Sequence, residues 1–160
     1  MLLNKMETRM KPVEECFYYF PQFKKDFTFL TKNKIVIEIE PEYRLSWNES
    51  DKSLGEYFYD FKKSCSYKRP VKGGFWRPIE ETFNISRSAL KHLVSSNGRE
   101  RETVKMSKAY EKLMEILVPY REKIKTVENF IKIKNIIQDA DQKDYDSMKR
   151  SLDKIKSLLK

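Results

Sequence analysis

The chain has 160 residues, a formal net charge of +9, and a composition that is 39% hydrophobic and 36% charged. This length suits one compact domain, or one domain with an appended helical element, and excludes two large independent domains. The apolar and aromatic content excludes wholesale disorder, and the presence of only four glycines argues against a turn-rich β-sandwich.

The sequence shows no membrane span and no signal peptide, and its cysteines are few; these three features predict the cellular compartment. No apolar run approaches the roughly 20 residues that span a bilayer, and the start MLLNKMETRMKP carries charges where a signal peptide needs its apolar stretch. Cys16 and Cys65 are isolated thiols, which fits a reducing compartment better than a disulfide framework, with a single bridge as the alternative. Together with His92 they offer too few ligands for a zinc site. We therefore expect a soluble, cytoplasmic protein without a metal or cofactor.

The first third of the chain combines aromatic residues with alternating apolar patterns. Residues 13–20 are predicted to be helical, and the aromatic run over residues 17–29 is predicted to pack in the core. Residues 34–40 read KIVIEIE, with an isoleucine at every second position, which predicts a half-buried strand. Residues 43–47 alternate in the same way, with Tyr43, Leu45 and Trp47 on one face. The two segments together predict a short β-hairpin.

Helical spacing of apolar residues marks most of the remaining chain. Asn48 or Ser50 is predicted to cap a helix that runs to about Lys63. Its core-facing stripe consists of four residues: Leu54, Tyr57, Phe58 and Phe61. Residues 64–74 are predicted to be a loop. Apolar residues from position 110 to 131 keep helical spacing, with Pro119 either kinking or restarting the helix, and residues 145–159 predict a final amphipathic helix.

The excess positive charge is concentrated in one third of the chain. Residues 62–110 contain twelve basic and four acidic side chains, so they carry +8 of the total charge of +9. A merely solvated surface tends to spread its basic and acidic residues evenly. The concentration therefore favours a surface that contacts phosphate groups, with an incidental basic loop as the alternative.

The segment FWRPIEETFNISRSALKHLVSSNG, residues 75–98, has the features of two short helices joined by a tight turn. Ile79 and Phe83 are predicted to face inward from the first helix, and Asn84 suits a left-handed turn conformation. Ser86 is predicted to cap the second helix. From that helix three residues point back to the core: Ala89, Leu90 and Leu93. A helix-turn-helix is therefore predicted over residues 77–97, although Glu80 stands where such motifs usually place a small residue.

The outer face of the second helix provides the candidate contacts to nucleic acid. Arg87 is expected to reach guanine through two hydrogen bonds, Ser88 a base or phosphate, and Lys91 and Ser95 the backbone. Residues 99–106 are expected to form either a β-wing or the first turns of the next helix. The complete predicted site is Arg77, Arg87, Ser88, Lys91, His92, Ser95, Arg99, Arg101 and Lys105.

These elements predict a mainly α fold with a short β-hairpin, built on a helix-turn-helix or winged-helix-like core and completed by a C-terminal helical hairpin. The expected divisions are an aromatic-rich segment with the hairpin (1–47), a domain with the helix-turn-helix (48–118), and the C-terminal helical hairpin (119–160). We expect the last division to pack on the same core as the second.

The stretches LSWNESDKSLGEYFYDF and FWRPIEETFNI resemble the C-terminal region of RteC-type regulators of Bacteroides conjugative elements. The resemblance covers about residues 45–117 and rests on five positions: Trp47, Leu54, Glu56, Phe83 and Asn84. It implies a winged-helix-like DNA-binding region and a transcriptional regulator of a mobile or accessory element. The different N-terminus and the added C-terminal hairpin depart from that pattern, and leave open whether a target site is shared.

Two other functions compete with DNA binding. A small ribonuclease or toxin would have to use His92, the only histidine, as its general acid or base. A protein-interaction module would use the C-terminal amphipathic helices to bind a partner or a second copy. We expect no enzyme activity, and expect double-stranded DNA as the partner, with a homodimer through the C-terminal helices compatible with DNA binding and no membrane partner.

Overall fold

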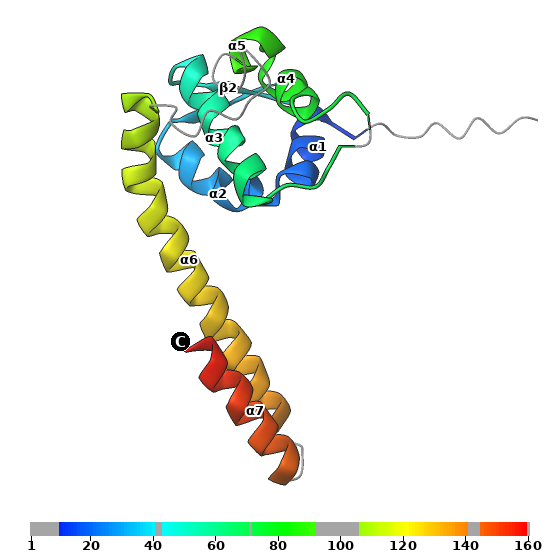
Figure 1. Cartoon of the computed structure of the whole chain (residues 1–160), viewed down its shortest axis with the longest axis vertical. Coiled ribbons are helices and arrows are strands. Elements are labelled where there is room, and N and C mark those ends of the chain that lie inside the picture. The colour runs from blue at the N-terminus through cyan, green and yellow to red at the C-terminus, as the bar shows by residue number, and fades with distance from the viewer. Residues whose placement is uncertain (1–9, 41–42, 71, 92–105, 141–144, 160) are drawn as a thin grey trace, which may run out of the picture. The chain divides into compact units, whose positions relative to one another are not determined.

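The computed structural model describes residues 10–40, 43–70, 72–91, 106–140 and 145–159. The chain divides into two units, Met1–Glu115 and Ile116–Lys160, and each is described by itself. The elements of the described residues are α1 (Pro12–Tyr19), α2 (Pro21–Lys32), β1 (Val36–Ile39), β2 (Arg44–Trp47), α3 (Asp51–Ser64), α4 (Arg77–Phe83), α5 (Arg87–Lys91), α6 (Lys108–Ala140) and α7 (Tyr145–Leu158). The expected mainly helical fold with a two-stranded antiparallel hairpin is confirmed (Figure 1).

The core of the first unit is built around the aromatic residues of α1, α2 and α3. The ring of Phe58 lies 5.0 Å from that of Phe20, 5.1 Å from that of Phe23 and 5.9 Å from that of Phe83, in each case edge to face. Such edge-to-face pairs add stability beyond the burial of apolar area. Phe20 and Phe23 of the aromatic run are fully buried, as is Phe58 of α3, whereas Tyr18 of the run is 51% exposed, so the prediction that this run packs in the core is confirmed only in part.

The β-hairpin places a different face against the core than the isoleucine pattern predicts. Val36 pairs with Trp47 and both are buried, whereas Ile37 and Ile39 remain 45% and 43% exposed. In an antiparallel pair, directly opposite residues share a face. Since α1 and α4 contact β2, the burial of Leu45 and Trp47 determines the register and turns the isoleucines outward.

Helix α3 runs through the middle of the first unit and matches its prediction closely. The Ser50 hydroxyl accepts a hydrogen bond from the Ser53 backbone N–H at 3.2 Å, so Ser50 is the N-cap. The predicted stripe of four apolar residues is buried throughout: Leu54, Tyr57, Phe58 and Phe61. The indole N–H of Trp47 donates to the Ser53 hydroxyl at 3.0 Å, which joins the hairpin to the start of the helix.

Helix α3 also carries two buried polar contacts that join distant segments. The Tyr57 hydroxyl donates to the buried Asp26 carboxylate at 2.7 Å, linking α3 to α2. The buried Glu56 carboxylate accepts from the Ser107 backbone N–H at 2.7 Å and from the Ser107 hydroxyl. A carboxylate at a helix N-terminus satisfies exposed N–H groups and interacts favourably with the helix dipole. Glu56 therefore fixes the start of α6 to α3.

Helices α3 and α5 approach each other closely at Gly55. A Cβ atom at this position would lie only 2.8 Å from the backbone carbonyl oxygen of Leu90. Leu90 is itself fully buried. The small residue that permits this close contact with α5 is thus in α3.

The second unit consists of α6 from Ile116 onward and α7. Helix α6 continues through Pro119 without ending, and residues of both helices line one depression, so the two helices lie side by side (Figure 1). Several large apolar side chains of this unit remain about half exposed: Ile116, Val118, Val127, Phe130, Ile131, Ile137, Met148, Leu152 and Leu159. No helix in the described part of the chain has the length and apolarity to cross a membrane.

Replacing Gly55 by alanine tests the contact between α3 and α5. The new methyl group would force the Leu90 backbone away, and overpacking typically costs about 1–3 kcal/mol, which exceeds the gain in helix propensity of about 1 kcal/mol. We expect a net loss in the free energy of unfolding, measured by urea denaturation. Lys52→Ala, at an exposed position of the same helix, should change it by less than about 0.5 kcal/mol. A Gly55→Ala protein as stable as the wild type would contradict this packing.

Candidate nucleic-acid interface

Helices α4 and α5 are joined by a turn with the predicted geometry. Asn84 adopts the left-handed conformation with φ 50° and ψ 46°, which asparagine tolerates better than most residues. The Ser86 carbonyl then accepts hydrogen bonds from the N–H groups of Ala89 and Leu90 at 3.1 and 3.4 Å, and α5 begins. Ile79 and Leu90 are fully buried and face the core from either side of the turn.

The first residues of α5 lie on the outside of the first unit. Ser86, Arg87 and Ser88 are exposed, and the hydroxyl groups of Ser86 and Ser88 lie 3.0 Å apart, within hydrogen-bonding distance. The placement of Arg87 and Ser88 on the outer side agrees with the predicted orientation of this helix. These three polar side chains are therefore open to solvent at the start of α5.

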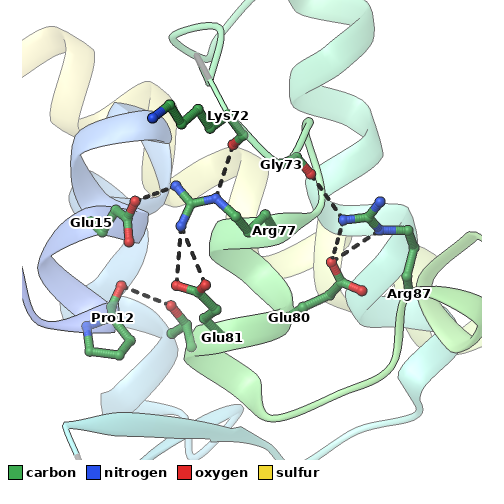
Figure 2. A network of polar contacts seen from close by, with 9 residues as sticks. Pro12, Glu15, Lys72, Gly73, Arg77, Glu80, Glu81 and Arg87 are labelled. Carbon is green, nitrogen blue, oxygen red and sulfur yellow. Dashed lines mark hydrogen bonds and ion pairs between the residues drawn. The ribbon is translucent and has the colours of Figure 1, made fainter.

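Arg77 lies inward and holds three parts of the chain together (Figure 2). Its guanidinium pairs with the Glu15 carboxylate of α1 and with Glu81 one turn further along α4, and its Nε donates to the Lys72 carbonyl at 3.0 Å. Hydrogen bonding to Glu15 raises the pKa of Arg77 above its ordinary value, so the charge is permanent. With only 23% of its side chain exposed, Arg77 acts mainly as a structural link.

Arg87 is more exposed and is held at one edge only (Figure 2). Its Nε and Nη2 atoms donate to the Glu80 carboxylate at 3.1 and 2.8 Å, and Nη2 also donates to the Gly73 carbonyl at 2.9 Å. The side chain remains 44% exposed. Glu80, which departs from the usual pattern of the motif, thus orients the arginine at the start of α5.

The loop between α3 and α4 is consequently fixed by both arginines. Arg77 binds the carbonyl of Lys72 and Arg87 binds that of Gly73, and Gly73 adopts a positive φ of 80°, which glycine does without steric cost. The end of this loop is therefore anchored beside α4 and α5, whereas the Lys68 backbone earlier in the loop is bonded to Tyr19 at the end of α1. The exposed basic residues before the anchored end are Lys62 and Lys63 of α3 and Lys68, Arg69 and Lys72 of the loop.

The structure describes three of the nine predicted site residues in full and one, Lys91, only as part of a helix. The other five lie outside the described residues. Lys91 is the last residue of α5, and its side chain is not described. His92, Ser95, Arg99, Arg101 and Lys105 lie outside the described residues, as do the predicted helix end at residues 97–98 and all but the last residue of the predicted wing. The arrangement of Arg77, Arg87 and Ser88 is therefore the part of the site that the structure supplies.

Comparisons with known proteins supply no relative from which a function of these residues could be inferred. No protein family, no curated protein and no solved structure matches this chain.

The contributions of Arg77 and Arg87 to stability can be compared by replacing each with methionine. Methionine keeps an apolar side chain but removes the charge. Arg77→Met would leave the largely buried Glu15 without its partner, and we expect a loss of about 2 kcal/mol in the free energy of unfolding. Arg87→Met removes an exposed ion pair and should cost less than about 1 kcal/mol. Chemical denaturation of both variants makes the comparison. Equal losses would mean that Arg77 is no more structural than Arg87.

Proposed function

We propose that this chain binds duplex DNA through a helix-turn-helix formed by α4, the turn at Asn84, and α5. The observation that carries the proposal is the exposed polar start of α5 outside a buried helix junction, with the end of a basic loop anchored beside it. In proteins of this class the second helix enters the major groove and the flanking residues bind the phosphate backbone.

The charge of the flanking loop supports a polyanionic ligand. Five basic side chains between residues 62 and 72 are exposed, and none of them forms an ion pair with another residue in the described ranges. Positive side chains that are not neutralised internally gain free energy when they replace the counterions condensed on DNA. Binding should therefore weaken steeply as the salt concentration rises.

The geometry of Arg87 refines its role in this proposal. Its contacts to Glu80 and Gly73 use Nε and Nη2, which leaves Nη1 as the donor directed to an outside acceptor. Reading guanine requires two parallel N–H donors, whereas a phosphate oxygen can be bound by one. We therefore assign Arg87 to a phosphate rather than to a base edge, and the exposed Ser88 to a base contact.

We further propose a role in transcriptional regulation. The resemblance to RteC-type regulators supports this role, and the order of elements from Trp47 through α3 and α4 is compatible with it. Regulators of this kind commonly bind as two-fold dimers, whose half-sites are separated by about one helical turn of DNA.

Arg87→Met is the direct test of the duplex-binding surface. If Arg87 binds a phosphate, the variant should bind all duplex sequences more weakly by a similar factor, and the slope of log K against log salt should fall by about 1. Fluorescence anisotropy with labelled duplexes at several salt concentrations measures both quantities. Lys24→Met, which removes an exposed charge from α2, is the matched control. A wild-type slope for Arg87→Met would overturn this assignment.

The exposed apolar residues of the second unit favour a second copy of the chain as an additional partner. Val127, Phe130 and Ile131 lie on one side of α6 with exposed fractions of 47%, 63% and 54%, and Met148 and Leu152 are similarly exposed on α7. Two helices alone cannot enclose a core, whereas two helical hairpins can combine into a four-helix bundle. We propose that these residues form the dimer interface.

Sedimentation equilibrium of a Phe130→Ser variant tests the dimer. The substitution places a hydroxyl in the proposed apolar interface, and we expect a shift from dimer toward monomer while the helical circular dichroism signal is retained. Ile37→Ser, at a similarly exposed isoleucine of the hairpin, should leave the association unchanged. A wild-type protein that is monomeric at all concentrations would reject the interface.

A further inference from the structure

A second surface of the first unit combines exposed lysines with aromatic rings that are not buried. It lies where the loop after α3 passes the end of α1 (Figure 1), and the Lys68 backbone N–H donates to the Tyr19 carbonyl there at 2.7 Å. We call it the aromatic–basic patch and define it by six residues: Tyr18, Tyr19, Lys62, Tyr67, Lys68 and Phe75.

The rings of the patch differ from those of the core in their exposure. Tyr18 is 51% exposed, and Tyr19, Tyr67 and Phe75 are half-buried, whereas the rings of α3 in the core are almost completely enclosed. Tyr18 and Tyr19 meet edge to face at 5.3 Å, and Tyr67 meets Phe75 in the same way at 4.9 Å. These contacts hold the rings in place while part of each remains open to solvent.

The lysines of the patch lie over the same rings. The Lys68 ammonium is 4.2 Å from the centre of the Tyr18 ring, and the Lys62 ammonium is 6.0 Å from the centre of the Phe75 ring. Both distances are within the range of a cation–π interaction. The arrangement places each positive charge next to a partly exposed aromatic residue, so that a ligand could meet both groups at once.

From this arrangement we infer that the aromatic–basic patch binds unpaired nucleotides of a single strand, with their phosphates at the lysines and their bases against the rings. Single-stranded nucleic acid is recognised in this way, by positive side chains along the backbone and by aromatic stacking platforms. In a duplex the base faces are covered by neighbouring base pairs, so the rings would have no stacking partner. An acidic peptide would use the lysines but not the rings.

The inference rests on the proposed binding of nucleic acid and adds single-stranded nucleic acid as a second ligand beside the duplex. The loop over residues 65–76 connects the two surfaces, since it begins at the patch and its Gly73 carbonyl contacts Arg87 at the start of α5. The full ligand would then be a duplex that continues into a single strand, with the duplex at α5 and the strand at the patch.

The experiment compares the full-length protein and its variants on three labelled probes: an oligothymidylate, an abasic strand of the same length, and a fully paired duplex. Stacking requires the wild type to bind the oligothymidylate more tightly than the abasic strand. Tyr18→Leu should weaken oligothymidylate binding about fivefold or more, the usual effect of losing one base–aromatic stack. Tyr18→Phe keeps the ring and should bind as the wild type does.

Tyr43→Leu is the matched control, because Tyr43 is 56% exposed and also lies beneath a lysine, with the Lys11 ammonium 3.4 Å from its ring centre, but it is on the hairpin. It should leave oligothymidylate binding unchanged. Equal affinity for the abasic strand and the oligothymidylate would overturn the inference and indicate an acidic ligand bound through charge alone. Failure of the duplex-binding proposal would instead appear as weak duplex binding that Arg87→Met does not change.

Discussion

The arrangement of the loop against α4 and α5 depends on two guanidinium groups that bind consecutive backbone carbonyls. Arg77 and Arg87 hold the carbonyls of Lys72 and Gly73, and each arginine is in turn held by glutamates of α1 or α4. A loop with two glycines in positive φ would otherwise have many accessible conformations. The contacts of the two arginines remove this freedom, so Lys72, Gly73 and the start of α5 keep a fixed relation to one another.

Much of the fold could be predicted because its signals are local. The four-residue stripe of α3 and its cap at Ser50 follow from helical spacing and from the preference of serine for that position. The left-handed turn at Asn84 follows from the chemistry of asparagine. In each case the information lies within a few neighbouring residues, which is the range over which sequence patterns are informative.

The features that the sequence did not reveal depend on contacts between distant residues. The alternation over residues 34–40 predicts a strand but cannot decide which face is buried, and contacts of α1 and α4 with β2 turn Ile37 and Ile39 outward. The inward position of Arg77 is not visible in the local sequence, because one of its two glutamate partners, Glu81, is a neighbour on the same helix but the other, Glu15, lies 62 positions earlier. Glu80 departs from the sequence pattern of the motif, and its partner Arg87 is seven positions further on, outside the spacing of one helical turn.

Adjacent residues of α3 hold both ends of the chain segment that follows α5. Gly55 contacts the Leu90 backbone before this segment, and Glu56 binds Ser107 after it. The distance that the segment must bridge is therefore determined by a single turn of α3. Because both anchors belong to the same turn of α3, the core fixes where Leu90 and Ser107 lie relative to each other, and a change in the length of the chain between them would leave these two positions in place.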